Sequence, residues 1–307
     1  MSRLSPSTLA HILLLSVVAL WGATFVLIKD ALRDAPPLLF NLLRMIVAAL
    51  VLAIVNHRHL RRIPRKNIAA GALVGLFLAA GYQFQTAGLA RTTAAKSAFI
   101  TGLVVVFVPL LTAIPVLRPS STPAPGRLTV LGALLAFCGL LLLTTPPGTA
   151  WSNLFTSIGF GDLLTLICAI AFAGHLLSLA HTSPKVPIPQ LATLQIFFAV
   201  SIMAITLPLG GPLYLSVTPR LILALSVTGV LATAAAFTIQ SWAQQHLPPT
   251  HTALLLTLEP VFAWLTSFLF LGERLGSRSL TGALLILAGI LLTELFSSSS
   301  PIPEHPL

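Results

Sequence analysis

The sequence predicts an all-α integral membrane protein with ten transmembrane helices, arranged as two inverted five-helix repeats with both termini cytoplasmic. Three observations predict this fold. Apolar residues make up 56% of the 307 residues and charged residues 8%, at a mean hydropathy of +0.97, too apolar to build the surface of a soluble domain. Ten apolar runs are each about 20 residues long, the length that spans a bilayer. The two halves of the chain also match each other.

Each predicted span is an apolar run bounded by charge, proline or glycine, and the loops between spans are short. The first run contains Trp21, Thr24 and Lys29 and no small-residue cleavage pattern, so we expect it to be retained and not removed as a signal peptide. Residues 297–307, rich in serine and proline, are expected to form a disordered tail. The spans begin near Thr8, Pro36, Ile68, Thr93, Arg127, Gly161, Ile188, Pro219, His251 and Arg278.

The 17 Lys and Arg residues outnumber the 7 Asp and Glu residues, but they are scattered between apolar runs, so no nucleic-acid partner is expected. The positive-inside rule instead places both ends in the cytoplasm, mainly through the basic loop from His57 to Lys66. That loop is either an orientation anchor near anionic lipid or a partner-binding loop. Cys138 and Cys168 lie in apolar runs without metal-ligand spacing, so no disulfide, metal or cofactor is expected.

Residues of the first half recur in the second half at a nearly constant separation, and the longer loop from Arg118 to Gly126 absorbs the drift. Because five spans per half is an odd number, the second half must enter the membrane in the opposite sense. Residues 1–147 and 148–296 are therefore predicted as inverted repeats, which permit alternating access around a central site. The matched positions are Trp21/Phe172 and Arg44/Gln195, 151 apart; Tyr82/Phe237, Gln85/Gln240, Thr86/Ser241 and Lys96/His251, 155 apart; and Gly132/Gly282, 150 apart.

Two segments resemble the half-signatures of the EamA-type transporters of the drug/metabolite transporter superfamily. They are HTALLLTLEPVFAWLTSFLFLGERLGSRSLTGALLILAGILLTE from His251, and LWGATFVLIK from Leu20 with FNLLRMIVAAL from Phe40. The resemblance implies a ten-helix bundle in the plasma membrane that exports or imports amino acids or other small metabolites. The third, fourth, eighth and ninth helices would line its cavity. This chain departs from a symmetric pattern where Val104 stands opposite Glu259.

An ionisable side chain inside a span must face the bundle interior, which makes it a candidate for function. Glu259 lies near mid-span, on one predicted helical face with His251, Thr252 and Thr266, and Pro260 after it is expected to kink the helix. One interpretation is a coupling site for a proton or cation. The other is a carboxylate that bonds to neighbouring backbone and holds the kink.

Two basic residues inside spans also have alternative interpretations. Arg44, three residues after Asn41, could clamp a substrate carboxylate, pair with Glu259, or extend toward the membrane surface. Lys96 begins the fourth span and is either a substrate-binding residue or an interface lysine. We keep both among the candidate residues.

The eighth span carries Ser226, Thr233, Gln240 and Gln244 at spacings of seven, seven and four, which predicts one polar face. Such a face either binds substrate or packs helices together. For His175, a proton carrier and a satisfied core histidine are the alternatives. The candidate substrate-binding residues are Trp21, Thr24, Asn41, Arg44, Tyr82, Gln85, Thr86, Lys96, His175, Thr233, Gln240, Gln244, His251 and Thr252, with Glu259 as the candidate ion-coupling residue.

These features together predict a secondary transporter that moves a small metabolite by alternating access, with a proton as the candidate coupling ion. Export is favoured over import by the resemblance alone. The absence of an ATP-binding P-loop supports a secondary transporter. An enzyme is not expected, because the sequence has no paired aspartates, HExxH, or GxSxG with a partner histidine. A passive channel or a lipid flippase on the same scaffold is the alternative. The expected partners are the substrate, the lipid bilayer and protons, and the chain is either a monomer or a homodimer.

Overall fold

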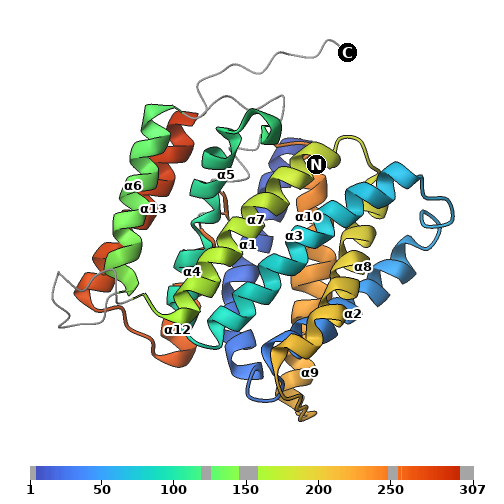
Figure 1. Cartoon of the computed structure of the whole chain (residues 1–307), viewed down its shortest axis with the longest axis horizontal. Coiled ribbons are helices and arrows are strands. Elements are labelled where there is room, and N and C mark those ends of the chain that lie inside the picture. Colours follow the sequence, from blue (N-terminus) through green and yellow to red (C-terminus); the bar gives the residue numbers. More distant parts are fainter. Residues whose placement is uncertain (1–4, 119–125, 145–157, 248–254, 257, 298–307) are drawn as a thin grey trace.

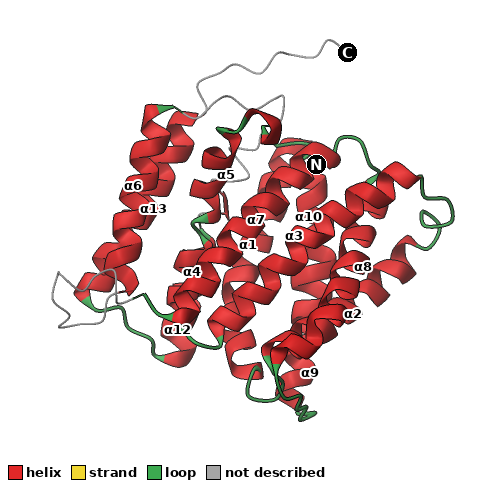
Figure 2. Cartoon of the chain, in the orientation of Figure 1, coloured by secondary structure: helices red, strands yellow, loops and turns green. Residues whose placement is uncertain are grey.

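The computed structural model describes residues 5–118, 126–144, 158–247, 255–256 and 258–297, which form helices and loops without a β-strand (Figures 1 and 2). The all-α class is therefore confirmed for the described residues. The first half contains α1 (Pro6–Ala31), α2 (Pro37–Asn56), α3 (Arg65–Leu89), α4 (Ala94–Thr101), α5 (Val104–Thr112), the 3-10 helix η1 (Pro115–Leu117) and α6 (Arg127–Thr144). The second half contains α7 (Phe160–Thr182), α8 (Ile188–Thr206), η4 (Leu207–Gly210), α9 (Pro219–Ser226), the π-helix η5 (Val227–Ala235), α10 (Ala236–Ala243), α12 (Glu259–Leu271) and α13 (Ser277–Ser297).

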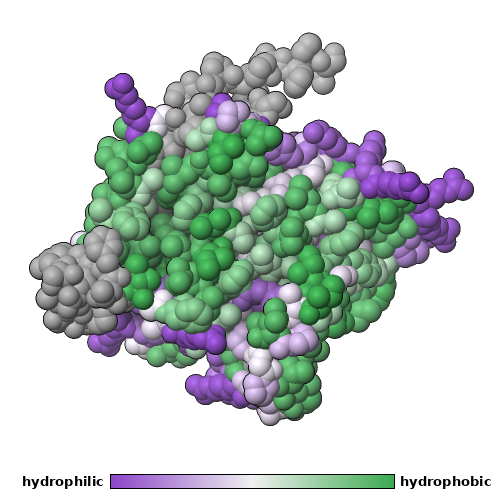
Figure 3. All heavy atoms as spheres, viewed as in Figure 1, coloured by the Kyte–Doolittle hydropathy of each residue, from purple (hydrophilic) through white to green (hydrophobic). Residues whose placement is uncertain are grey.

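Seven helical segments among the described residues are long and apolar enough to cross a membrane, and three shorter apolar helices accompany them. The shorter ones, Val130–Leu143, Glu259–Leu271 and Ser277–Gly289, fall on the fifth, ninth and tenth predicted spans. Apolar side chains cover the middle of the face in Figure 3, and hydrophilic ones gather at its margins. A surface of this kind is suited to lipid, so the chain is a multi-pass membrane protein.

Two spans are interrupted inside the bundle. Gly102 and Leu103 separate α4 from α5, and α12 begins only at Glu259. Pro260 explains the second start, because proline lacks a backbone N–H and is favoured in the first helical turn. Of the predicted stripe through His251, Thr252, Glu259 and Thr266, the last two lie on α12. His251 and Thr252 themselves lie outside the described residues.

The predicted polar face of the eighth span is wrong at one end. The stretch from Val227 to Ala235 is a π-helix. Its backbone hydrogen bonds join residues five positions apart, one more than in an α-helix. The wider turn changes which residues share a face. Ser226 is therefore exposed, although Thr233 is buried.

Helices of the first half pack largely on helices of the second half. Helix α6 packs along α13, α3 packs on both α7 and α8, and α1 packs on α12. In Figure 1, α6 and α13 stand side by side at one edge of the molecule. The two halves of the sequence are thus intertwined in space and share one interior.

Glycines let the backbones of α6 and α13 approach closely. A Cβ atom added to Gly139 would lie 2.5 Å from the carbonyl oxygen of Gly282, and one added to Gly282 would lie 2.6 Å from that of Gly139. A Cβ atom added to Gly289 would meet the Gly132 carbonyl oxygen in the same way. Since Gly132 and Gly139 correspond to Gly282 and Gly289 in the repeat, the two contacts are equivalent, as a two-fold relation between the helices requires.

We predict that Gly139→Ala lowers stability by about 1–3 kcal/mol, because the new methyl group has no room against the α13 backbone. The measurement is the thermal midpoint of the detergent-solubilised protein, followed by size-exclusion chromatography. Gly276→Ala is the matched control, since its Cβ would meet nothing within 4 Å. Equal midpoints for the two variants would contradict the packing argument.

The loop between α1 and α2 is fastened to the start of α9 by a buried carboxylate. Asp34 accepts hydrogen bonds from Arg220 Nη2 at 2.7 Å and Nε at 2.8 Å, and from the Thr218 hydroxyl at 2.6 Å. The same loop accepts a hydrogen bond from the Tyr214 hydroxyl at the Leu32 carbonyl. Bonding to the Arg220 guanidinium lowers the pKa of Asp34 from 3.8 to about 2.

This lowered pKa predicts a pH-dependent part of the stability. Because the folded-state pKa is depressed, the stabilisation is present above pH 3.8 and is lost as the pH falls toward about 2. We expect Asp34→Asn to be less stable than the wild type at pH 7, and the gap to narrow below about pH 4. Thermal midpoints from pH 7 to pH 2.5 measure this; a gap that stays constant would refute the role of the ion pair.

Candidate functional site

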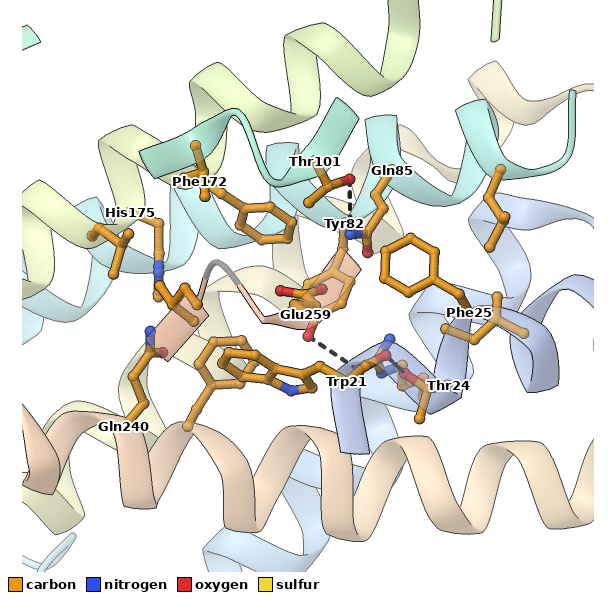
Figure 4. A pocket seen from close by; sticks show the side chains of 17 residues that line it. Trp21, Thr24, Phe25, Tyr82, Gln85, Thr101, Phe172, His175, Gln240 and Glu259 are labelled. Carbon is orange, nitrogen blue, oxygen red and sulfur yellow. Dashed lines mark hydrogen bonds between the residues drawn. The ribbon is translucent and has the colours of Figure 1, made fainter. Parts of the chain in front are cut away.

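A cavity of about 60 Å³ lies in the interior, enough for a handful of water molecules. It is lined by 17 residues, many of which Figure 4 labels. They are Trp21, Thr24, Phe25 and Ile28 of α1, Arg44 of α2, Tyr82, Gln85 and Leu89 of α3, Thr101 of α4, Val104 of α5, Phe172, His175 and Leu176 of α7, Phe237 and Gln240 of α10, Leu256, and Glu259 of α12.

Aromatic rings form the walls of this cavity. Tyr82 packs edge-on against Phe172 with ring centroids 5.4 Å apart, and Trp21 packs against Phe237 at the same distance. Tyr82 and Phe237 contact each other at 6.0 Å. Because Tyr82 corresponds to Phe237 and Trp21 to Phe172, the first two contacts are equivalent, and the third joins a residue to its own counterpart.

The same correspondence extends around most of the cavity. Seven pairs of lining residues are separated by 151 or 155 positions, the separations found in the sequence, so 14 of the 17 lining residues have their counterpart in the wall. The pairs are Trp21/Phe172, Thr24/His175, Phe25/Leu176, Tyr82/Phe237, Gln85/Gln240, Thr101/Leu256 and Val104/Glu259.

Arg44 is 1% exposed and is held by both halves of the chain. Its Nε donates to the Thr233 hydroxyl at 2.7 Å, and its Nη2 donates to the Tyr82 hydroxyl at 3.0 Å and to the Ala232 carbonyl oxygen at 3.3 Å. The guanidinium lies 4.3 Å from the centre of the Tyr82 ring. Among the described residues no carboxylate lies within ion-pair distance of it, so pairing with Glu259 is excluded there, and its burial excludes extension to the membrane surface.

Glu259, at the first turn of α12, is partly buried and faces the cavity. In Figure 4 its carboxylate is drawn between Trp21 and Phe172. Within the described part of the chain it has no ion-pair partner, and its side chain accepts no hydrogen bond. The alternative of a carboxylate that holds a kink through backbone bonds therefore has no contact to support it.

Histidine and amide side chains add neutral polar groups to the wall. His175 Nε2 lies 3.0 Å from Gln195 Oε1, so the ring is hydrogen-bonded in the core. Gln85 Nε2 donates to the Thr101 hydroxyl at 3.5 Å, and the Thr24 hydroxyl donates to the Trp21 carbonyl oxygen at 2.7 Å. The Oε1 atom of Gln240 is buried and has no partner within the described residues.

Several candidate residues do not line the cavity. Asn41 donates to the Tyr82 carbonyl at 2.8 Å and accepts from Thr86 at 3.0 Å, so both side chains join α2 to α3. Thr233 contacts Arg44 from behind the wall. Gln244 is partly buried outside the cavity, and His251 and Thr252 lie beyond the described residues.

Lys96 lies at a separate place, at the start of α4. Its ammonium group is 2.8 Å from Asp162 Oδ2, and the Thr92 hydroxyl donates to Asp162 Oδ1 at 3.0 Å. Glu273 accepts hydrogen bonds from the Ala94 and Ala95 amides at the same helix end. Lys96 is therefore an ion-pair partner of α7 and does not line the cavity.

Sequence reasoning missed the apolar part of the wall. Phe25, Ile28, Leu89, Leu176 and Leu256 were not candidates, because an apolar residue that faces a cavity has the same sequence signature as one that faces lipid. The internal repeat was the one signal that could have found some of them, since Phe25 and Leu176 correspond to each other. Among the described residues no cluster of three His, Cys, Asp or Glu side chains could hold a metal ion.

The chain is similar over most of its length to proteins described as transporters. It is 30% identical over 282 residues to an uncharacterized transporter of Archaeoglobus fulgidus, covering 92% of this chain and 84% of that protein. It is 23% identical over 288 residues to the uncharacterized transporter YoaV of Bacillus subtilis, covering 91% and 94%. A solved crystal structure matches the fold with a TM-score of 0.67 at 18% identity, covering 94% of this chain and 98% of that one.

The model of the EamA-like transporter family matches residues 8–145 and again residues 159–295. Together these two stretches take in nearly all of the helices described above. They also carry every residue that lines the cavity. By sequence, and with a fold in keeping, the chain belongs to the EamA-like transporter family.

Proposed function

We propose that this protein is a secondary transporter that moves small metabolites, amino acids or related polar and amphipathic compounds, across the plasma membrane by alternating access. In this proposal the chain crosses the membrane ten times, as inverted repeats of residues 1–147 and 148–296, with both termini in the cytoplasm. Membership of a transporter family supports the general activity. The direction, which we propose to be export, follows from the resemblance to the family.

The observation that carries the proposal is the cavity whose walls come from corresponding positions of both halves. Seven corresponding pairs line it, and two of them, Tyr82/Phe237 and Trp21/Phe172, make equivalent ring contacts. A site on such an axis can open to either side of the membrane when the two repeats exchange their conformations. A fixed pore does not require walls built from corresponding positions of two halves.

The size of the cavity favours a conformational cycle. At about 60 Å³ it is too small for a metabolite the size of an amino acid, whose binding sites are typically some hundreds of Å³. Substrate binding therefore requires the helices to separate on one side. The breaks before Val104 and Glu259 are corresponding positions at which half-helices could move.

The charges in the wall fit a zwitterion. Arg44 offers a guanidinium and Glu259 a carboxylate, neither of which has an ionic partner within the described residues, while aromatic rings surround both. A substrate carboxylate at Arg44 and an ammonium group or proton at Glu259 would neutralise both charges, which lowers the free energy of holding them away from water. A passive channel or lipid flippase remains the alternative function, and no observation on this site favours it.

Efflux from proteoliposomes tests the proposal. We expect vesicles loaded with a pooled mixture of amino acids, nucleosides, sugars and cationic dyes to release one class saturably, faster when the same compound is present outside. An imposed pH gradient should change the rate. Flux that rises linearly with concentration would support a channel. Flux no faster than the leak from vesicles without the protein would contradict a carrier for these classes of compound. In that case a lipid-flipping assay tests the flippase alternative.

Glu259→Gln tests the coupling role separately. Because glutamine keeps the shape but neither ionises nor releases a proton, we expect the variant to lose the response to the pH gradient while still binding the substrate. Asp30→Asn is the matched control, since Asp30 is 37% exposed in the α1–α2 region away from the cavity. A gradient response unchanged in Glu259→Gln would rule out this residue as the proton site.

A further inference from the structure

The one π-helical segment of the described chain, η5 (Val227–Ala235), lies directly behind Arg44. Two of its residues hold the guanidinium, Thr233 through its hydroxyl and Ala232 through its carbonyl oxygen. The same carbonyl oxygen accepts a hydrogen bond from Trp21 Nε1 at 2.8 Å. A carbonyl in mid-helix thus binds two side chains of the cavity wall, using the two lone pairs of its oxygen.

The π-helix coincides with a stretch of the second half that is one residue longer than its counterpart in the first half. Gly75 of α3 packs against the Gln195 carbonyl oxygen and the Phe198 Cβ atom, and Gly229 of η5 packs against the Arg44 carbonyl oxygen and the Val47 Cβ atom. Since Gln195 and Phe198 lie 151 positions after Arg44 and Val47, these glycines correspond, at a separation of 154.

The next corresponding pair, Tyr82 and Phe237, is separated by 155 positions. Seven positions lead from Gly75 to Tyr82, but eight lead from Gly229 to Phe237. The extra residue lies within this stretch, where the π-helix accommodates it without displacing the residues on either side. Short π-helical segments inside α-helices are frequent at functional sites.

The first half provides an internal comparison without the extra residue. Helix α3 is a regular α-helix from Arg65 to Leu89, and Gln195 is the counterpart of Arg44 that faces it. The Nε2 group of Gln195 is buried and has no hydrogen-bond partner within the described residues. The regular helix thus gives its facing side chain no acceptor, whereas the π-helix gives Arg44 two.

We propose that η5 is a positioning element, produced by a one-residue insertion, that fixes the Arg44 guanidinium so that its free Nη1 group binds an anionic group of the substrate. This inference rests on the proposed transport function. Thr233 and the Ala232 carbonyl fix the plane of the guanidinium through Nε and Nη2, and Nη1 is left without a partner among the described residues. Thr233 is therefore a positioning residue that does not touch the substrate.

Two readouts test the proposal. The first is hydrogen exchange of the Arg44 Nε–H group, followed by NMR of protein labelled with ¹⁵N-arginine and assigned by the signal that Arg44→Lys removes. The second is the ratio of flux for L-phenylalanine to flux for L-phenylalaninamide, which differ in the carboxylate. We expect Thr233→Val to speed the exchange and to lower the flux ratio, each by about tenfold, the effect of losing one hydrogen bond to a charged group. Thr233→Ser, which keeps the hydroxyl, should restore both.

Thr228→Val is the matched control, because the Thr228 hydroxyl is buried on the same segment but bonds to the Ala224 carbonyl of its own helix. It should leave both readouts at wild-type values. Deletion of Leu231, which is 49% exposed, should yield a folded protein with the Thr233→Val behaviour, whereas deletion of Leu76, 50% exposed on α3, should disrupt folding.

Wild-type exchange and a wild-type flux ratio in Thr233→Val would overturn the proposal, as would equal changes in Thr228→Val. If the wild type carries neither compound, transport of this substrate pair fails, but the exchange measurement still decides whether η5 positions Arg44. The two failures are therefore distinguishable. If the Leu231 deletion variant misfolds, the claim that η5 arose from a one-residue insertion is contradicted.

Discussion

The constraint on which this structure depends is that lipid offers no hydrogen bonds to a backbone. Every amide and carbonyl within the membrane must find its partner inside the protein, which is why the chain is helical and why irregular backbone is confined to the interior. The break between α4 and α5 and the start of α12 at Glu259 lie against the cavity, and the π-helix η5 lies behind its wall, where it binds Arg44. The interruptions of the regular α-helices therefore lie close to the charged residues Arg44 and Glu259.

Corresponding sequence positions of the two halves line the cavity, and its two charged residues stand where the halves differ. Corresponding residues surround the cavity as a shell that is largely aromatic and apolar. Arg44 and Glu259 correspond to Gln195 and Val104, so each charge occurs in one half alone. A symmetric scaffold can thus hold an asymmetric binding site, which a substrate with two different ends requires.

Close packing between the two halves of the chain explains why they form one bundle and not two. Glycines 139 and 282 bring α6 and α13 into backbone contact, and Gly75 and Gly229 do the same between α3 and α8 and between η5 and α2. Because each of these contacts joins a helix of one half to a helix of the other, a movement of either helix would alter the shared interior. The Asp34–Arg220 ion pair further couples the first repeat to α9.

The sequence by itself determined the membrane class and the family, and it predicted the approximate helix positions and the repeat, because these depend on composition, on runs about as long as a bilayer is thick, and on motifs read along the chain. It also singled out Arg44, Glu259, Tyr82 and the paired glutamines, since polar groups stand out against an apolar background. Only the tertiary structure decided which of these residues meet. It assigned Asn41 and Thr86 to packing, paired Lys96 with Asp162, separated Arg44 from Glu259 and revealed the π-helix behind Arg44. Those outcomes depend on contacts between segments far apart in the chain, and in a membrane helix an apolar residue looks the same in sequence whether it faces lipid or a cavity.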